Sequence, residues 1–253
     1  MYRSGDIIRL YHTQRAGLMR SCAQFYHSTN TLNKDETPMN EKILLVDDHT
    51  LIREGLRSIL EVELGMKVIG QAADGLQAVS SAEELRPDII IMDVELPLLN
   101  GREATRRIKQ RNDSVRIIAL SMHGDRGNVI GMFQSGADAY LLKHCAVDEL
   151  QDAIHAVLSG RRYLSNHLTD VLLESFATSS PGTQDAVYHQ LTARERQVLQ
   201  LIAEGRSTKE AAAILGCAIS TVETHRQHLF NKLQVQSVAD LTKEAIRLGL
   251  THL

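Results

Sequence analysis

The chain has 253 residues, 43% of them hydrophobic, and 28 Lys and Arg against 31 Asp and Glu give a formal net charge of −3. These values fit a globular protein of one or two domains, and no apolar run approaches the roughly 18 residues of a membrane-spanning helix, so we expect no membrane contact. Cys22, Cys145 and Cys217 are odd in number and far apart, which argues against a disulfide framework or metal-ligand spacing and favours reduced thiols in the cytoplasm.

The charge is unevenly distributed along the chain. Residues 1–38 carry five basic against three acidic side chains (+2), residues 39–190 carry 15 against 22 (−7), and residues 191–253 carry eight against six (+2). An acidic middle suits a cation site, and a mildly basic end suits nucleic-acid phosphates. A charge of +2 is weak evidence for DNA on its own, so that inference depends on motifs.

Residues 1–38 show neither a helical nor a strand period. Four arginines precede residue 35 with Asp6 as the only acid, a composition that also occurs in organelle transit peptides. We favour a disordered extension or a start codon assigned too far upstream, because the chain from Met39 begins like a domain of its own.

From Met39 onward, short apolar runs alternate with helical patterns. We expect strands over Ile43–Val46, Lys67–Ala73, Ile89–Asp93, Val115–Ser121 and Ala139–Leu142. We expect helices where Leu51, Leu56, Ile59 and Leu60 recur, and over Leu76–Arg86, Glu103–Arg111, Asn128–Ser135 and Val147–Ser159. This alternation predicts a doubly wound parallel sheet of five strands in the order 2-1-3-4-5, within a domain of residues 39–160.

Polar side chains follow four of these strands where each strand ends. They are the doublet Asp47 and Asp48, then Asp93, Ser121 and Lys143. The carboxyl ends of parallel strands line one crevice, so these groups should converge there. Three carboxylates favour a hard divalent cation, and a lysine beside them can neutralise an incoming phosphoryl group. The pattern therefore predicts an aspartate that accepts phosphate.

Residues 161–190 change character and are predicted to form a linker. The stretch Ser179–Thr183 is a cluster of helix and strand breakers, and the tract has no steady apolar period, apart from a short helix expected near Leu168–Leu173.

Residues 191–253 read as four helices. Thr192 with Glu195, and Ser207 with Glu210, have the spacing of capping boxes that begin the first two. After the turn at Gly216, a third helix is expected over about Ile219–Leu233, and a fourth over about Val238–Leu248. A helix, a short glycine-containing turn and a second helix form a helix-turn-helix unit.

Both halves resemble known domains. Residues 40–160 resemble the receiver domain of bacterial response regulators. Residues 191–253 resemble a LuxR-type helix-turn-helix domain through Leu191–Glu195, Lys209–Ala212 and Thr221–Arg226. Together they resemble a two-component regulator of the NarL/FixJ type. That resemblance implies a sensor histidine kinase and promoter DNA as partners, and a homodimer on phosphorylation or on DNA.

The resemblance also implies roles for the strand-end residues. Asp93 would be the phosphoacceptor and a ligand of Mg²⁺, which Asp47, Asp48 and the backbone carbonyl of Glu95 would also hold. Ser121 and Lys143 would contact the phosphoryl oxygens, and Tyr140 would be an aromatic switch. His49 is interpreted as a polar residue at a helix start rather than as a ligand.

The third helix of the last domain would be the recognition helix in the major groove, with Thr and Gln near base edges and Arg and Lys on phosphates. Its candidate DNA-binding residues are Thr221, Glu223, Thr224, Arg226, Gln227 and Lys232. Ala218 stands where the family usually has a serine N-cap, a loss of about 1 kcal/mol unless Ser220 or a shifted start compensates. In the fourth helix, Leu241, Ala245 and Leu248 fit either a dimer contact or core packing.

Two other functions remain open. The same acids, lysine and Mg²⁺ would suit a phosphatase or phosphotransferase, but then the attached helix-turn-helix needs an explanation. A receiver that works as an interaction module without phosphorylation typically loses an acid or the lysine, and here all are present. We therefore predict a transcriptional regulator rather than an enzyme.

Overall fold

The structure is a computed structural model that describes residues 41–165, 168–169, 187–188 and 190–251. The extension 1–38 and most of the linker 161–190 lie outside the described residues, so those interpretations stay predictions. Within the described part, no helix is long and apolar enough to cross a membrane.

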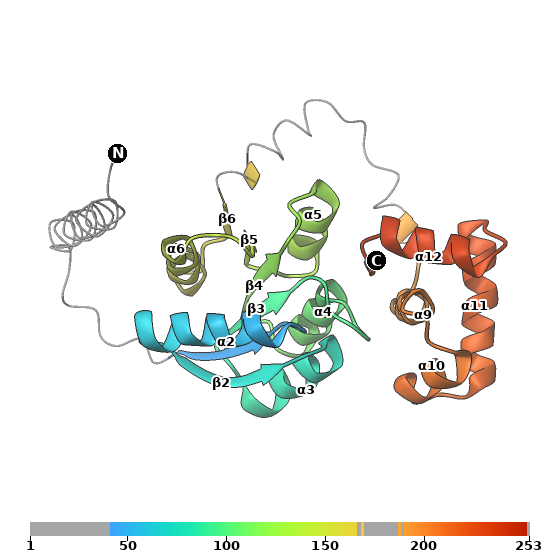
Figure 1. The fold of residues 1–253 in the computed structure, drawn as a ribbon, viewed down its shortest axis with the longest axis horizontal. Coiled ribbons are helices and arrows are strands. Elements are labelled where there is room, and N and C mark those ends of the chain that lie inside the picture. Colours follow the sequence, from blue (N-terminus) through green and yellow to red (C-terminus); the bar gives the residue numbers. More distant parts are fainter. Residues whose placement is uncertain (1–40, 166–167, 170–186, 189, 252–253) are drawn as a thin grey trace, which may run out of the picture. The chain divides into compact units, whose positions relative to one another are not determined.

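A six-stranded parallel sheet forms the first domain, in the order β2-β1-β3-β4-β5-β6 (Figure 1). The strands are β1 (Lys42–Val46), β2 (Lys67–Ala72), β3 (Ile89–Asp93), β4 (Arg116–Ser121), β5 (Ala139–Leu142) and β6 (Tyr163–Leu164). The predicted order 2-1-3-4-5 is confirmed. The sixth strand was not predicted, because two residues are too few to show a period.

Helices cover both faces of this sheet. They are α2 (Thr50–Ser58), the π-helical turn η1 (Ile59–Glu63), α3 (Gly75–Leu85), α4 (Gly101–Arg111), α5 (Arg126–Gln134) and α6 (Val147–Leu158). Side chains of α3, α4 and α5 share apolar clusters with one face of the strands, while α2 and α6 lie on the other face (Figure 1). Every residue of β3 and β5 is buried, which explains their uninterrupted apolar runs.

The first helix differs from its predicted apolar face. Leu51 is 86% exposed, and α2 has no buried residue. Only Leu60 is fully buried, within the π-helical turn that follows. The partly buried positions Ile52, Leu56 and Ile59 follow the spacing i, i+4 and i+7, so Leu51 lies one position away from this face.

Four helices form the second domain. They are α9 (Ala193–Ala203), α10 (Thr208–Leu215), α11 (Ile219–Leu233) and α12 (Val238–Arg247). Both predicted capping boxes are present at the starts of α9 and α10. Gly216, at φ 60°, ends α10 in the left-handed conformation that glycine adopts without strain, and the chain turns there into α11.

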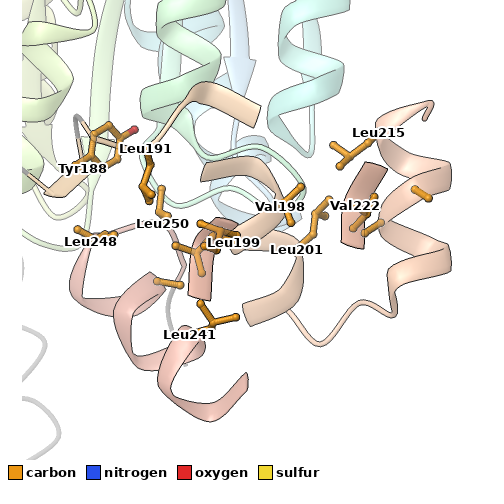
Figure 2. Packing of buried hydrophobic residues seen from close by; sticks show 14 residues of the cluster. Tyr188, Leu191, Val198, Leu199, Leu201, Leu215, Val222, Leu241, Leu248 and Leu250 are labelled. Carbon is orange, nitrogen blue, oxygen red and sulfur yellow. The ribbon is translucent and has the colours of Figure 1, made fainter. Parts of the chain in front are cut away.

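One apolar cluster holds these helices together (Figure 2). Val198 and Leu199 of α9 pack in it with Val222 of α11. Leu241, Ala245 and Leu248 belong to the same cluster and are almost completely buried. These three residues therefore pack in the core of the domain, which is the second of the two interpretations of that helix.

Candidate functional site

The predicted strand-end acids meet at one edge of the sheet. β3 pairs with both β1 and β4, so Asp93 ends between the neighbours that carry Asp47 and Ser121. Asp47 is 2% exposed and Asp93 is 1% exposed. Lys143 reaches between them, with its Nζ 2.7 Å from Asp47 Oδ2 and 2.7 Å from Asp93 Oδ2. The distances confirm that these groups converge.

One lysine does not fully neutralise two buried carboxylates. Burial, with a smaller contribution from the charge of Asp47, raises the pKa of Asp93 to about 7, although the ion pair and hydrogen bond with Lys143 act in the opposite direction. Burial lowers the pKa of Lys143, but the nearby Asp93 and Asp47 outweigh it, so the net shift is upward. The cluster therefore favours an additional cation.

The arrangement of oxygens fits a hard divalent ion. Carboxylate oxygens of Asp47, Asp48 and Asp93 and a ring nitrogen of His49 lie within 4.8 Å of one another. Asp48 is exposed, so the cluster is open to solvent on that side. Oxygen-rich groups with room for water suit Mg²⁺. His49 is the residue before α2 and makes no side-chain cap, while its Nδ1 lies 2.7 Å from Asp48 Oδ1.

Ser121 and Tyr140 are linked through one loop. Ser121 is completely buried, and its Oγ accepts a hydrogen bond from the backbone N–H of His123 at 3.0 Å. Tyr140 is also completely buried, and its hydroxyl donates to the carbonyl of His123 at 2.6 Å. Burial raises the pKa of Tyr140, so the phenol keeps its proton for this bond. Both side chains thus hydrogen-bond to the backbone of His123, in the segment that follows β4.

The loop after Asp93 carries a second set of contacts. Residues 40–253 form one compact unit. Within it, the side chain of Gln200 in α9 makes two hydrogen bonds to this loop. Its Oε1 accepts from the N–H of Asn100 at 2.9 Å, and its Nε2 donates to the carbonyl of Leu96 at 2.8 Å. Arg196 pairs with Glu103 at 3.0 Å, both nearly buried. No local pattern in the sequence indicates these pairs, because each joins residues about 100 positions apart.

Most candidate DNA-binding residues lie on the surface of α11. Thr221, Glu223, Thr224 and Gln227 are exposed. Arg226 is half-buried, with its guanidinium 5.6 Å from the ring of Phe230. Polar side chains on an accessible helix match the requirements for base reading in the major groove.

Lys232 and Ala218 have structural roles within the domain. The Nζ of Lys232 lies 2.7 Å from Glu195 Oε2, so this lysine joins α11 to α9. Ala218 is the N-cap residue of α11, and no side chain caps this helix. Ser220 does not compensate: it lies inside the helix, where its carbonyl accepts from Thr224 Oγ1.

Comparison with known proteins matches both domains. Residues 43–155 match the family described as "Response regulator receiver domain". Residues 189–245 match "Bacterial regulatory proteins, luxR family".

Two relatives match this chain over most of its length. The chain is 36% identical to the nitrate/nitrite response regulator protein NarL of Escherichia coli over 195 residues, which is 77% of this chain and 90% of that protein. It is 37% identical to the transcriptional regulatory protein LiaR of Bacillus subtilis over 212 residues, 84% of this chain and 98% of that one.

Solved structures agree with the fold. A LuxR-family two-component response regulator from Aurantimonas sp. matches with a TM-score of 0.52 and 38% identity, over 55% of this chain and 99% of that one. The RcsB response regulator of Salmonella typhimurium matches with a TM-score of 0.57 over 83% and 98%, and its 24% identity supports the fold alone.

The receiver sheet with its acid edge, followed by the LuxR-type helices, defines a two-component response regulator. Within that class, the chain belongs to the NarL/FixJ family of transcriptional response regulators.

Proposed function

We propose that this protein is a transcriptional regulator whose DNA binding is switched by phosphorylation of Asp93. The arrangement of Asp93, Asp47 and Lys143 carries the proposal. Asp93 is a buried acid at a strand end, and the Nζ of Lys143 lies 2.7 Å from a carboxylate oxygen of Asp93 and 2.7 Å from one of Asp47. A sensor histidine kinase would be the donor. An Asp93 carboxylate oxygen attacks phosphorus, the P–N bond of the phosphohistidine breaks, and the histidine takes up a proton.

Each residue of the cluster has a part in that transfer. Asp47, Asp48, Asp93 and the backbone carbonyl of Glu95 would hold Mg²⁺, which when bound offsets negative charge on the acids and on the phosphoryl oxygens. Lys143 neutralises a phosphoryl oxygen and keeps Asp93 ionised for attack. The N–H of Glu95 donates to Asp93 Oδ1 at 3.1 Å and orients its carboxylate.

Two routes lead from Asp93 to the rest of the chain. A phosphoryl oxygen would draw the hydroxyl of Ser121 away from the N–H of His123, and the bond from Tyr140 to His123 couples the aromatic ring to that movement. The other route is the loop that follows Asp93, which Gln200 bonds at Leu96 and Asn100. Movement of that loop would weaken the contact with α9 and free the DNA-binding domain.

On DNA, α11 would enter the major groove with Thr221, Thr224 and Gln227 toward base edges. Lys232 pairs with Glu195, so a DNA phosphate would share its ammonium group, which has three donors, with that carboxylate. A single helix-turn-helix reads a short site, so specific binding would need a homodimer. Leu241, Ala245 and Leu248 are in the core, so a dimer through α12 would use its other side, where Val238 is 42% exposed.

An enzyme that turns over a phosphorylated substrate is the second candidate. Glu95 is the carboxylate nearest in sequence to the phosphoacceptor on its C-terminal side, and we assign it to tuning of phosphoryl hydrolysis rather than to turnover. The LuxR-type domain has no role in such an enzyme, and the NarL/FixJ family is one of transcriptional regulators. We therefore propose that the protein is not an enzyme.

Phosphorylation can be tested with the purified full chain. Incubation with a small phosphodonor and Mg²⁺ should add the mass of one phosphoryl group, and chelation of Mg²⁺ should prevent it. Asp93→Asn should give no adduct, while the matched control Asp113→Asn, an exposed acid outside the cluster, should behave like the wild type. An adduct that survives in Asp93→Asn would place the acceptor elsewhere.

The N-terminal extension gives a separate test of the domain boundaries. A chain that starts at Met39 should accept phosphate and bind DNA as the full chain does, since we propose that residues 1–38 contribute to neither. Loss of either property would assign a function to that extension.

A further inference from the structure

A second cluster of potential metal ligands lies in the DNA-binding domain, far in sequence from the acids of the receiver. Glu195 of α9 and His225 and His228 of α11 each offer one ligand atom, and these atoms lie within 4.8 Å of one another. Two imidazoles and a carboxylate form the set that holds zinc in several enzymes, with one position left to water. This donor set is softer than the oxygens around Asp93, and therefore selects a different class of ion.

The geometry of α11 brings the two histidines together. Residues three apart are neighbours on one side of a helix. Val222 and Leu229 of α11 are buried against the core of the domain, with Val222 labelled in Figure 2. His225 lies between them in sequence at the edge of that packed face, and His228 is one turn further on and 55% exposed. The cluster thus has one inner and one solvent-facing imidazole, which gives an ion a path of entry.

An independent observation indicates a missing partner. The Nδ1 atom of His225 is buried and has no hydrogen-bond partner among the residues that the structure describes. A buried polar nitrogen without a partner costs about 1–3 kcal/mol, and a metal bond would remove that cost. One histidine of the cluster therefore has a buried nitrogen that no described residue of the protein satisfies.

The two carboxylate oxygens of Glu195 face different partners. Its Oε2 accepts from the N–H and hydroxyl of Thr192 at 2.8 and 3.0 Å and from Lys232 at 2.7 Å. Its Oε1 lies 4.0 Å from His228 Nδ1. Oε2 is thus occupied by Thr192 and Lys232, and Oε1 is the oxygen that faces His228.

We propose that Glu195, His225 and His228 form a zinc site that joins the recognition helix α11 to α9. Ligands of a tetrahedral zinc ion lie about 3.4 Å apart for bonds of about 2.0–2.1 Å. The present ligand atoms lie within 4.8 Å of one another, so a bound ion would draw them together, and the exposed His228 has room to turn toward it. His228 lies one helical turn after Thr224 on the exposed side, so a bound ion would border the surface that reads DNA. Zinc would then stabilise the domain and fix the helix in its reading position.

The test is a zinc titration of the full chain against a chromophoric chelator, in excess Mg²⁺ to fill the acid cluster of the receiver. The wild type should bind one equivalent of Zn²⁺ that His228→Ala binds at least 10-fold more weakly. The matched control His155→Ala, a half-buried histidine of α6, should bind as the wild type does. Because His228 is exposed, its loss should leave the fold intact, which circular dichroism would verify.

Cobalt gives a second readout of the same site. The wild type and His155→Ala should show the visible absorption of tetrahedral Co²⁺, and His228→Ala should lose it. If all three proteins bind Zn²⁺ equally, or if the wild type binds none in excess Mg²⁺, the proposal is wrong. The second of these results would leave only the 4.0 Å contact between His228 and Glu195 that the structure shows. Neither result bears on phosphorylation of Asp93.

Discussion

Two buried carboxylates, Asp93 and Glu195, each lie 2.7 Å from a lysine, yet their acidities shift in opposite directions. Burial raises the pKa of Asp93 to about 7 with help from Asp47 beside it. Glu195 is also buried, but Lys232 and both donors of Thr192 hold its pKa below the usual range. Since each lysine is equally close, the direction follows from the other surroundings: deeper burial and the charge of Asp47 at Asp93, and the two donors of Thr192 at Glu195.

That difference separates a site of chemistry from a site of structure. Glu195 completes a capping box and joins α11 to α9, so the fold itself supplies the donors for its Oε2. The charges of Asp93 and Asp47 are only partly satisfied by Lys143, so they retain affinity for Mg²⁺ and reactivity toward phosphorus. Substitutions at either site change the balance between the buried charge and its partners.

The largest effect should come from Lys143→Ala. Removing the one cation between two buried acids should cost about 3–5 kcal/mol of receiver stability without Mg²⁺. Mg²⁺ should restore part of that loss, because it supplies positive charge at the same place. Urea unfolding followed by circular dichroism, with and without Mg²⁺, measures both. Lys67→Ala, at the exposed start of β2, is the control; a loss in Lys143→Ala no greater than in that control would contradict the account.

Asp93→Asn should reveal the raised pKa as a dependence of stability on pH. A carboxyl group whose folded pKa is raised destabilises the fold as pH rises from its unfolded value of 3.8 to about 7. Without Mg²⁺, Asp93→Asn should therefore be more stable than the wild type at pH 7, on the order of a few kcal/mol, with little difference near pH 4. Unfolding titrations across this range test it, and a constant difference would contradict the assignment.

Glu195→Gln should give the opposite slope and a smaller effect. Since its folded pKa is lowered, Glu195 stabilises the domain above its unfolded pKa, and this is lost as pH falls through the folded pKa. The variant should lose about 1–2 kcal/mol at pH 7 and progressively less below pH 4.5, the ordinary value of a glutamate. A double-mutant cycle that combines Glu195→Gln with Lys232→Met would isolate the contribution of the ion pair. Additive losses of stability would show that the ion pair does not stabilise the domain.

The smallest effect concerns the start of α11. Its N-cap, Ala218, has the extended backbone of a capping residue but no side chain that accepts a hydrogen bond. Ala218→Ser should stabilise the domain by about 1 kcal/mol, and Ser207→Ala, which removes an existing cap of α10, should destabilise it by a similar amount. Thermal unfolding compares the pair. A loss of stability in Ala218→Ser would show that the helix begins elsewhere.

The sequence predicted the acid edge because its signals are local. Asp93 directly follows four buried apolar residues, and parallel strands bring their carboxyl ends together whatever their separation along the chain. The caps of α9 and α10 were predictable for the same reason, since each lies within four residues.

Features that depend on distant partners were not predictable. Gln200 and Arg196 have ordinary helix propensity, and only the folded chain brings them to Asn100 and Glu103. The pair between Lys232 and Glu195 likewise has no local signal, because the two residues lie 37 positions apart. The π turn after α2 also leaves no signal. Leu51 was included in the apolar pattern although it lies five residues from Leu56, a spacing that does not share one face of a helix.

The central claim is that phosphorylation of Asp93 controls the DNA-binding domain. Gel-shift titrations on a verified promoter at fixed salt test it most directly, because salt alone changes such affinities by orders of magnitude. The phosphorylated full chain should bind tightly, the unphosphorylated chain weakly, and a 185–253 fragment tightly without phosphate. Equal affinities of the phosphorylated and unphosphorylated full chain would contradict the account.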